Sequence, residues 1–401
     1  MPNQKNSVLI FCDLNDCGGG VYVYTQQITR AFREKGISVY IISHEPHGAR
    51  ESTFVLPLMA DASGYRLIPN NISDREIVRL LILYAKEIQP KWFFPNYREG
   101  AHAAMVPLKK LGIGNIFVCH NDHESQYRYG LRYQSVTDLF VCPSKKCETF
   151  LINNLGPMAS GRVRYVPHCV DIIDNAFQKT GEIGQPLKLL YCGRINFEQK
   201  QLQYLPNIMK ELELRGVNAS LNIVGAGRDR PELERLFDQD GIKNVCFHGY
   251  VERSSLADYF PNNDIVILTS LYEGFCLALA EVMAWGLPAV AFDCGGVIDD
   301  YLVDGQNGYI LAFGDVQEFA KKIEYLVLNS DIYSEFSRNA SAKIRENFSS
   351  QSFSKNYENL FYEETELHYS WPIFKSIYMS MDKYSVKNII EKLGKRFFQW
   401  N

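Results

Sequence analysis

Three features common in other protein classes are missing from this chain of 401 residues. None of its ten cysteines forms a C-x-x-C pair, so neither zinc nor a disulfide framework is indicated, and a reducing compartment is expected. No apolar run approaches the ~20 residues that cross a bilayer. The formal net charge of −4 lacks the basic excess of nucleic-acid-binding proteins, so no nucleic-acid partner is expected.

The amino terminus also lacks the pattern of a secretory signal. MPNQKNSVLIFC carries one lysine and a short apolar run that is more typical of a strand. A cytoplasmic location is therefore expected. The chain is longer than one core usually supports, and 46% of it is hydrophobic, so two folded domains are expected.

Strand and helix patterns alternate along residues 1–170, which form the predicted N-terminal domain. Such alternation is typical of β–α–β units and a parallel sheet. Ser73 followed by Glu76 has capping-box spacing and predicts a helix over residues 73–88. Apolar runs predict strands at 7–12, 38–43, 53–58, 91–95, 115–119, 139–142 and 162–167.

The alternation stops at residues 171–186, which are polar and predict an interdomain linker. It resumes over residues 187–350, the predicted C-terminal domain. Strands are predicted there at 187–192, 220–224, 244–247, 265–268 and 288–292, with helices near 203–215, 231–238, 254–260, 275–285 and 315–328. The architecture indicated is α/β: two tandem Rossmann-like, doubly wound parallel-sheet domains facing a cleft.

Residues 351–401 carry no strand pattern and predict C-terminal helices. One face of a helix near the end is apolar, and basic residues lie on the other faces. Such a helix could contact an anionic membrane surface peripherally. Packing of residues 351–401 back on the N-terminal domain is the simpler interpretation, and we favour it. The apolar positions are Val386, Ile389, Ile390, Leu393 and Phe397.

The most informative stretch is DIVILTSLYEGFCLALAEVMAWGLPAVAFDCGG, residues 264–296. A buried strand, a polar turn and a helix follow one another in it. Glu273 stands in the turn and Glu281 lies in the helix. A carboxylate can accept hydrogen bonds from vicinal sugar hydroxyls, and free N–H groups at a helix N-terminus bind phosphate. The stretch therefore predicts a pocket for a ligand that carries both sugar and phosphate.

Two cations follow the predicted strand 187–192. In open α/β sheets, ligands bind at the carboxyl ends of strands, so Arg194 and Lys200 are placed to bind a diphosphate. A guanidinium can grip phosphate oxygens with two hydrogen bonds, and lysine adds a compact charge. The spacing fits two solvated surface cations equally well.

Two glycine-rich turns also follow strands. Gly18–Gly20 precede a helix, as in a phosphate-binding loop, although a simple tight turn fits equally. Gly225 and Gly227 resemble part of a dinucleotide fingerprint. Arg230 stands in place of its third glycine and no ribose-binding acid follows, so an NAD-dependent oxidoreductase fits poorly.

The acidic and histidine-rich patterns do not indicate a metal. Residues 120–124, HNDHE, are adjacent in sequence, and adjacent side chains rarely converge on one ion. Asp238 and Asp240 form a D-x-D pattern at a helix end, where solvation is the better interpretation. His120 ends a predicted strand, so its imidazole could face the cleft and hydrogen-bond a sugar hydroxyl.

These motifs carry a family likeness. Residues 187–311 resemble the retaining GT-B glycosyltransferases of group 1, or family 4. The matching segments are YCGRINFEQK, LNIVGAGRDRPELE, VCFHGYVERSSLADYF and, above all, SLYEGFCLALAEVMAWGLPAVAFDCGG followed by DGQNGYIL. The N-terminal half is similar more loosely, through the Gly-rich first loop, VCHND and VCPSKKCETFL.

The resemblance implies a GT-B fold and a sugar transferase that retains anomeric configuration. The implied donor is a nucleotide-sugar, UDP- or GDP-linked, and the implied acceptor is a glycan or a lipid-linked molecule. No metal or other cofactor is implied. The implied context is assembly of cell-surface polysaccharide or lipopolysaccharide, with the acceptor expected on loops such as 50–71 and 97–102.

By the same resemblance, Arg194 and Lys200 would neutralise the donor diphosphate and Glu281 would hold the ribose hydroxyls. Glu273 would contact the transferred sugar and phosphate, and His120 would contact the sugar. The other implied donor-binding residues are Gly19, Gly20, Gly225, Val251, Gly274, Phe275, Cys276 and Leu277.

The chain departs from the family pattern in three places. Gln201 follows Lys200 where glycine is usual, His168–Cys169 replaces Asn-Gly, and the aromatic C-terminal extension has no obvious counterpart. Two other functions stay open: a non-catalytic nucleotide-sugar-binding subunit of a partner transferase, and a GT-B epimerase or phosphorylase. The combination of two cations with Glu273 and Glu281 favours the transferase.

Overall fold

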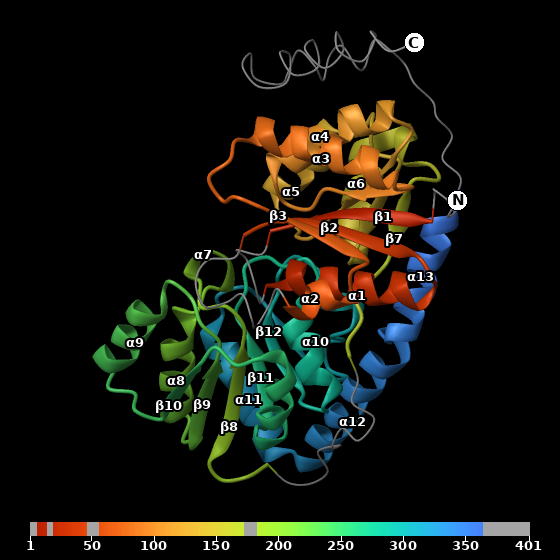
Figure 1. The fold of residues 1–401 in the computed structure, drawn as a ribbon. Coiled ribbons are helices and arrows are strands. Elements are labelled where there is room, and N and C mark those ends of the chain that lie inside the picture. The colour runs from red at the N-terminus through yellow and green to blue at the C-terminus, as the bar shows by residue number, and fades with distance from the viewer. Residues whose placement is uncertain (1–5, 14–18, 46–55, 172–182, 364–401) are drawn as a thin grey trace, which may run out of the picture. The chain divides into compact units, whose positions relative to one another are not determined.

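The computed structural model describes residues 6–13, 19–45, 56–171 and 183–363. The chain divides into two compact units (Figure 1). Of the described residues, the first unit holds those up to Pro143, those from Cys147 to Pro167 and those from Phe353. The second holds Ser144–Lys146 and His168–Ser352. Each unit is built on one parallel sheet, so the structure confirms the predicted α/β class.

The first sheet has seven parallel strands in the order β3-β2-β1-β4-β5-β6-β7. The order reverses between β1 and β4, which makes the carboxyl ends of these two strands the topological switch point, where ligands bind in this class of sheet. The strands are β1 (Ser7–Cys12), β2 (Ser38–His44), β3 (Gly64–Ile68), β4 (Trp92–Phe94), β5 (Gly114–Val118), β6 (Leu139–Cys142) and β7 (Val163–Tyr165).

Helices cover both faces of the first sheet, with α1 on one face and α3 and α4 on the other (Figure 1). The capping prediction at α3 is confirmed, because the Ser73 side chain accepts a hydrogen bond from the Glu76 backbone N–H. The helices are α1 (Gly20–Glu34), α2 (Leu56–Asp61), α3 (Asp74–Ile88), α4 (Glu99–Lys110), α5 (Glu124–Arg132), α6 (Lys145–Leu155) and α13 (Ser350–Tyr362).

Helix α13 contacts the first unit through specific polar bonds as well as aromatic packing. The hydroxyls of Tyr357 and Tyr24 lie 2.8 Å apart, and both side chains are fully buried. The indole N–H of Trp92 donates to the Phe361 carbonyl at 3.0 Å. This part of the C-terminal region therefore packs on the first sheet. The predicted amphipathic helix over 386–397 lies outside the described residues.

The second sheet has six parallel strands in the order β10-β9-β8-β11-β12-β13. Its order reverses between β8 and β11. The segments that follow these two strands therefore lie at the switch point of the second unit. The strands are β8 (Leu187–Cys192), β9 (Ala219–Val224), β10 (Val245–Gly249), β11 (Ile265–Leu268), β12 (Ala289–Phe292) and β13 (Gly308–Leu311).

The core of the second unit lies between these strands and helices α8 and α11. Asp315 caps α11 by accepting from the Glu318 N–H at 3.0 Å, as its spacing predicts. The helices are α7 (Phe197–Lys200), α8 (Tyr204–Leu214), α9 (Arg230–Gln239), α10 (Leu277–Ala284), α11 (Val316–Leu328) and α12 (Ser330–Asn347).

Some predicted elements are wrong. The expected strand over 53–58 is contradicted, because Leu56 begins helix α2 and the third strand is β3. Pro57 explains the error: it cannot donate to a strand ladder but fits the first turn of a helix. Residues 254–260 form 3₁₀ turns within Arg253–Asp258 and Phe260–Asn262 rather than one α-helix. Helices α5, α7 and α12 and strand β13 were not predicted.

Candidate functional site

Four of the predicted site residues lie at the switch point of the second sheet or in the helix that begins beside it. Arg194 and Lys200 belong to the segment that follows β8, and Glu273 follows β11. Glu281 lies in α10, the helix after that turn. Parallel strands end at the same edge of a sheet, so the topology brings together residues that are far apart in sequence.

Lys200 and Glu273 form a buried ion pair. The Lys200 ammonium lies 2.5 Å from Glu273 Oε1, and the side chains are only 12% and 6% exposed. Burial by itself lowers the pKa of Lys200, but the adjacent Glu273 carboxylate outweighs it and raises that pKa above its usual value. The Ser270 hydroxyl donates to the same carboxylate oxygen at 2.6 Å. The lysine is therefore held as a cation in one position.

Gln199 links this pair to Arg194, and sequence reasoning did not single it out. Its side-chain oxygen accepts from Arg194 at 3.2 Å, and its amide N–H groups donate to the Tyr272 carbonyl at 3.2 Å and to Glu273 at 3.5 Å. Its backbone carbonyl accepts from the Leu271 N–H at 2.8 Å. The segments after β8 and β11 are thus bonded to each other, which orients both cations relative to Glu273.

The turn before α10 is held by an aromatic cluster. The Tyr301 hydroxyl donates to the carbonyls of Phe275 at 2.7 Å and Cys276 at 3.2 Å. The Phe275 ring lies 5.1 Å from the Tyr301 ring and 5.5 Å from the buried His168 ring. Cys276, the N-cap of α10, has a φ of 60° and makes no side-chain capping bond. The sequence Gly274–Leu277 thus leads into a rigidly held helix N-terminus, where an anion is favoured.

Glu281 is paired with an arginine that the sequence did not indicate. Arg253 Nη2 lies 2.5 Å from Glu281 Oε1 and 3.4 Å from Asp171 Oδ2. Burial raises the pKa of Glu281, and Arg253 opposes that shift while Asp171 adds to it. The thiol of Cys192 lies near this group: burial raises its pKa to about 12, with further contributions from Glu281 and Cys276. Arg253 begins the 3₁₀ turn Arg253–Asp258 and lies in the matching segment VCFHGYVERSSLADYF, although no role is predicted for it there.

Close backbone packing explains why the turn after β9 contains two glycines. Gly225 has a φ of 149°, and a β-carbon there would lie 1.8 Å from the carbonyl oxygen of Gly193. At Gly227 a β-carbon would lie 2.0 Å from the Ile195 carbonyl oxygen. Both glycines allow two loop backbones to pack together at the ends of β8 and β9. Val251 lies half-buried after β10, the next strand of the sheet.

Contacts within the first unit hold the His120 imidazole in place. It follows β5, is 7% exposed, and its Nε2 lies 2.8 Å from Asn96 Oδ1. The ring stacks on Tyr97 at 5.3 Å, and the Asn96 amide donates to the Phe11 carbonyl at 3.0 Å. Asn96 and Tyr97 both have positive φ angles, 28° and 36°, which are rare for side-chain-bearing residues and common at functional sites.

The other predicted residues of the first unit lie near the switch point of the first sheet, between β1 and β4. Gly19 is the N-cap of α1 and Gly20 its first residue, so both follow β1. A β-carbon at Gly20 would meet nothing within 4 Å, so packing does not require a glycine there. Gly18 lies outside the described residues. The first sheet therefore carries Gly19, Gly20 and His120, and the second carries the remaining predicted site residues.

Within the described ranges, no three His, Cys, Asp or Glu side chains lie together in a way that could hold a metal ion. Asp240 of the D-x-D pattern ends α9 and lies 3.6 Å from Lys210. Over the same described ranges, every helix is too short or too polar to traverse a bilayer.

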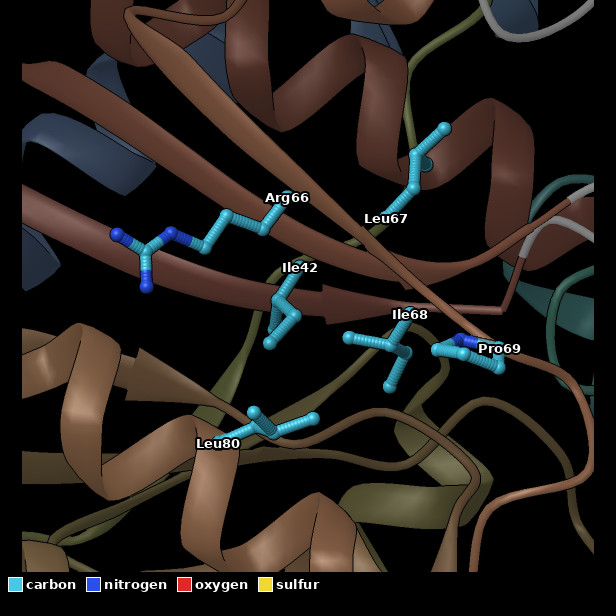
Figure 2. A pocket seen from close by; sticks show the side chains of 6 residues that line it. All are labelled: Ile42, Arg66, Leu67, Ile68, Pro69 and Leu80. Atoms are coloured by element: carbon cyan, nitrogen blue, oxygen red, sulfur yellow. The ribbon is translucent and has the colours of Figure 1, made fainter.

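A separate pocket of about 290 Å³ lies in the first unit between β2, β3 and α3 (Figure 2). Its one charged lining residue, Arg66, lies 2.5 Å from Glu87 and stacks over the Tyr84 ring at 4.3 Å. The pocket thus lacks the converging polar groups of a ligand site. The lining residues are Ile42, Arg66, Leu67, Ile68, Pro69 and Leu80.

Two parallel-sheet α/β units define the class of protein, a GT-B-type fold, and sequence comparison gives the family. Glycosyl transferases group 1 matches residues 172–343, and Glycosyltransferase Family 4 matches residues 18–173. The chain therefore belongs to the group 1/family 4 glycosyltransferases, as its motifs predicted.

Individual relatives are similar over a smaller part of the chain. Poly(ribitol-phosphate) alpha-N-acetylglucosaminyltransferase of Staphylococcus aureus is 31% identical over 155 residues, which are 38% of this chain and 31% of that protein. The chain matches about a third of the length of its curated relatives.

Solved structures share the fold over most of the chain. Sucrose-phosphate synthase from Thermosynechococcus elongatus has a TM-score of 0.72 at 16% identity, over 88% of this chain and 98% of that one. Anabaena Alr3699/HepE in complex with UDP and glucose has a TM-score of 0.72 at 18% identity, over the same shares of the two chains. The GT-B fold predicted from the motifs is confirmed.

Proposed function

We propose that this chain transfers a sugar from a nucleotide-sugar to a glycan or lipid-linked acceptor, with retention of anomeric configuration and without a metal ion. The observation that carries the proposal is the buried Lys200–Glu273 pair, bonded through Gln199 to Arg194 at the switch point of the second sheet. Two oriented cations beside a helix N-terminus suit a diphosphate leaving group.

The chemistry follows from where charge develops. As the bond from sugar to diphosphate breaks, negative charge grows on the departing phosphate oxygens. Arg194, Lys200 and the first N–H groups of α10 would stabilise that charge, and they need no reorganisation because Gln199, Glu273 and Tyr301 already hold them. A divalent cation is then unnecessary.

The remaining site residues are assigned to separate parts of the donor. Glu281 would accept hydrogen bonds from the ribose hydroxyls, since each carboxylate oxygen can serve one of them. Gly225 and Val251 would face the base. Glu273, with the backbone of Gly274–Leu277, would contact the transferred sugar and phosphate. His120, with Gly19 and Gly20, would be the contribution of the first unit to the sugar and phosphate.

Relatives support the substrate class. A protein of the same fold binds UDP and glucose, and a relative is named as acting on poly(ribitol-phosphate). We therefore propose a uridine or guanosine nucleotide donor and a role in cell-surface polysaccharide or lipopolysaccharide assembly. The nine described cysteines are all free thiols, which supports a cytoplasmic location. Peripheral contact of residues 386–397 with the inner membrane face is the alternative to the favoured packing on the N-terminal domain, and these residues lie outside the described ranges.

The decisive experiment follows nucleotide release. Purified chain is incubated with UDP- and GDP-sugars and with glycan and polyprenyl-phosphate-linked acceptors, and free nucleotide is measured with and without EDTA. Acceptor-dependent release that EDTA leaves unchanged, with the donor's anomeric configuration in the product by NMR, is expected. Donor binding without release for any acceptor would instead favour the non-catalytic subunit, and an altered free nucleotide-sugar would favour the epimerase.

A further inference from the structure

The surroundings of Glu281 pose a physical problem for a ribose-binding carboxylate. Its side chain is 13% exposed, and burial disfavours the ionised form. The groups that face it are Arg253 and Asp171, together with the thiols of Cys169 and Cys192. Among these described neighbours, the arginine alone carries positive charge. The ionisation of Glu281 therefore depends on one contact.

That contact is well formed. Arg253 Nη2 lies 2.5 Å from Oε1, so the guanidinium donates a hydrogen bond directly to the carboxylate, and a bond between charged groups is stronger than one between neutral groups. A carboxylate has about four lone-pair directions on its two oxygens, so one arginine bond leaves acceptors for two hydroxyls. A protonated carboxyl would instead present one donor and fewer acceptors, which suits a ribose diol poorly.

Asp171 is a second carboxylate in contact with the guanidinium. Its Oδ2 lies 3.4 Å from the same Arg253 nitrogen. The backbone beside Asp171 is anchored, because the Val170 N–H donates to the Phe348 carbonyl at 2.9 Å. The arginine thus lies between two carboxylates that come from distant parts of the second unit, and its orientation is set by both.

We propose that Arg253 is a positioning residue for the donor nucleotide: it keeps the Glu281 carboxylate charged and oriented for the two ribose hydroxyls, with Asp171 orienting Arg253 in turn. The inference rests on the proposed function, because it assumes that Glu281 binds ribose. It adds a residue that contacts neither the sugar nor the phosphate but acts through Glu281.

A ribose-specific probe tests this role. Affinities of the full-length chain for UDP, GDP and ADP are measured by calorimetry, and the tightest of these is compared with its 2′,3′-dideoxy counterpart. The variants are Arg253→Met, Arg253→Lys and Glu281→Gln. Arg235→Met is the matched control, because Arg235 is an exposed arginine of the same unit that pairs with Glu232.

For the ribonucleotide, Arg253→Met should weaken binding by about tenfold or more, since bonds to charged groups contribute ~1.5–3 kcal/mol. Arg253→Lys should recover part of the loss, and Arg235→Met should bind as wild type. For the dideoxynucleotide, wild type and Arg253→Met should bind alike. The loss of ribonucleotide affinity in Arg253→Met should also become smaller as pH rises from 5 to 8, because a higher pH ionises the Glu281 carboxyl even without its arginine partner.

Three outcomes overturn the inference. Equal losses for both nucleotides in Arg253→Met would show a general structural role for Arg253. Equal wild-type affinity for the ribonucleotide and the dideoxynucleotide would show that Glu281 does not bind the ribose hydroxyls, while leaving the proposed transferase activity untouched. Absence of any nucleotide binding by wild type would remove the proposed function itself, and the inference with it.

Discussion

Lys200 Nζ lies 2.5 Å from Glu273 Oε1, and both side chains are almost entirely buried. The family resemblance implies separate roles for them, Lys200 on the donor diphosphate and Glu273 on the transferred sugar and phosphate. Their pairing means that neither can be changed alone. Removing one partner of a buried ion pair leaves an uncompensated charge, which costs about 3–5 kcal/mol.

The first prediction concerns this pair. Lys200→Met and Glu273→Gln should each lower the free energy of unfolding by about 3 kcal/mol, and the double variant should recover much of the loss. Transfer should stay low in all three, because the cation is absent or displaced. Urea denaturation and nucleotide-release assays measure the two effects. Lys321→Met, in an exposed pair with Glu318, should cost under about 0.5 kcal/mol. Strictly additive losses would argue against coupling.

The second prediction separates stability from binding at Glu281. Its pKa is raised in the folded chain, first by burial, so the folded state holds the proton more tightly than the unfolded state. The stability that this proton contributes is present below the unfolded pKa and is lost as pH rises through the folded pKa. Glu281→Gln should therefore unfold at the same or a higher temperature at pH 7, while nucleotide affinity falls. A lower melting temperature together with wild-type affinity would contradict both expectations.

The third prediction concerns the turn after β9. Gly225→Ala should destabilise the chain severely, because its β-carbon would lie 1.8 Å from the Gly193 carbonyl oxygen and its φ of 149° disfavours alanine. Gly184→Ala is the matched control, since a β-carbon there meets nothing within 4 Å. Thermal melts of the two variants measure the difference. Similar melting temperatures would mean that the two loop backbones do not pack as closely as they do in the structure.

The fourth prediction is a loss of stability in acid. Burial lowers the pKa of His168 to about 3, whereas an unfolded histidine titrates near 6.5. As pH falls below about 6.5, this histidine binds a proton in the unfolded state but not in the folded state. The free energy of unfolding therefore falls by up to about 1.4 kcal/mol per pH unit. His168→Asn, if it folds, should lose less stability than wild type between pH 7 and pH 5 in thermal melts. The exposed His248, changed to Asn, serves as control, and identical slopes for all three chains would refute the assignment.

Much of the fold could be predicted because buried parallel strands leave a strong signal. Ile265–Leu268 is apolar throughout and forms β11 at the predicted bounds. The edge strand β3 gives no such signal, because Tyr65 and Arg66 are exposed. Apolar residues are denser at residues 53–58, so the pattern predicts the third strand there. Strand signals weaken wherever one side of the strand lies in solvent.

The structure explains how Gln201 can stand where the family pattern has glycine. The structure gives it a φ of 52°, the left-handed conformation that glycine adopts without strain. Its side-chain amide donates to the Glu198 carbonyl at 3.2 Å, a local bond that glycine could not make. The substitution thus preserves the backbone path that carries Lys200 towards Glu273.

The sequence by itself determined which residues follow strands, and hence that Arg194, Lys200 and Glu273 gather at one edge of a parallel sheet. It also determined the family, through Glu273, Glu281 and the glycines around them. Only the tertiary structure decided the pairings: Lys200 with Glu273, and Glu281 with Arg253. Spacing along a chain specifies strands and helices, whereas contacts between β8, β11 and α10 depend on strand order and on which buried charges find partners. For Lys200 and Glu273, burial makes the pairing a requirement, since a lone charge there would be costly.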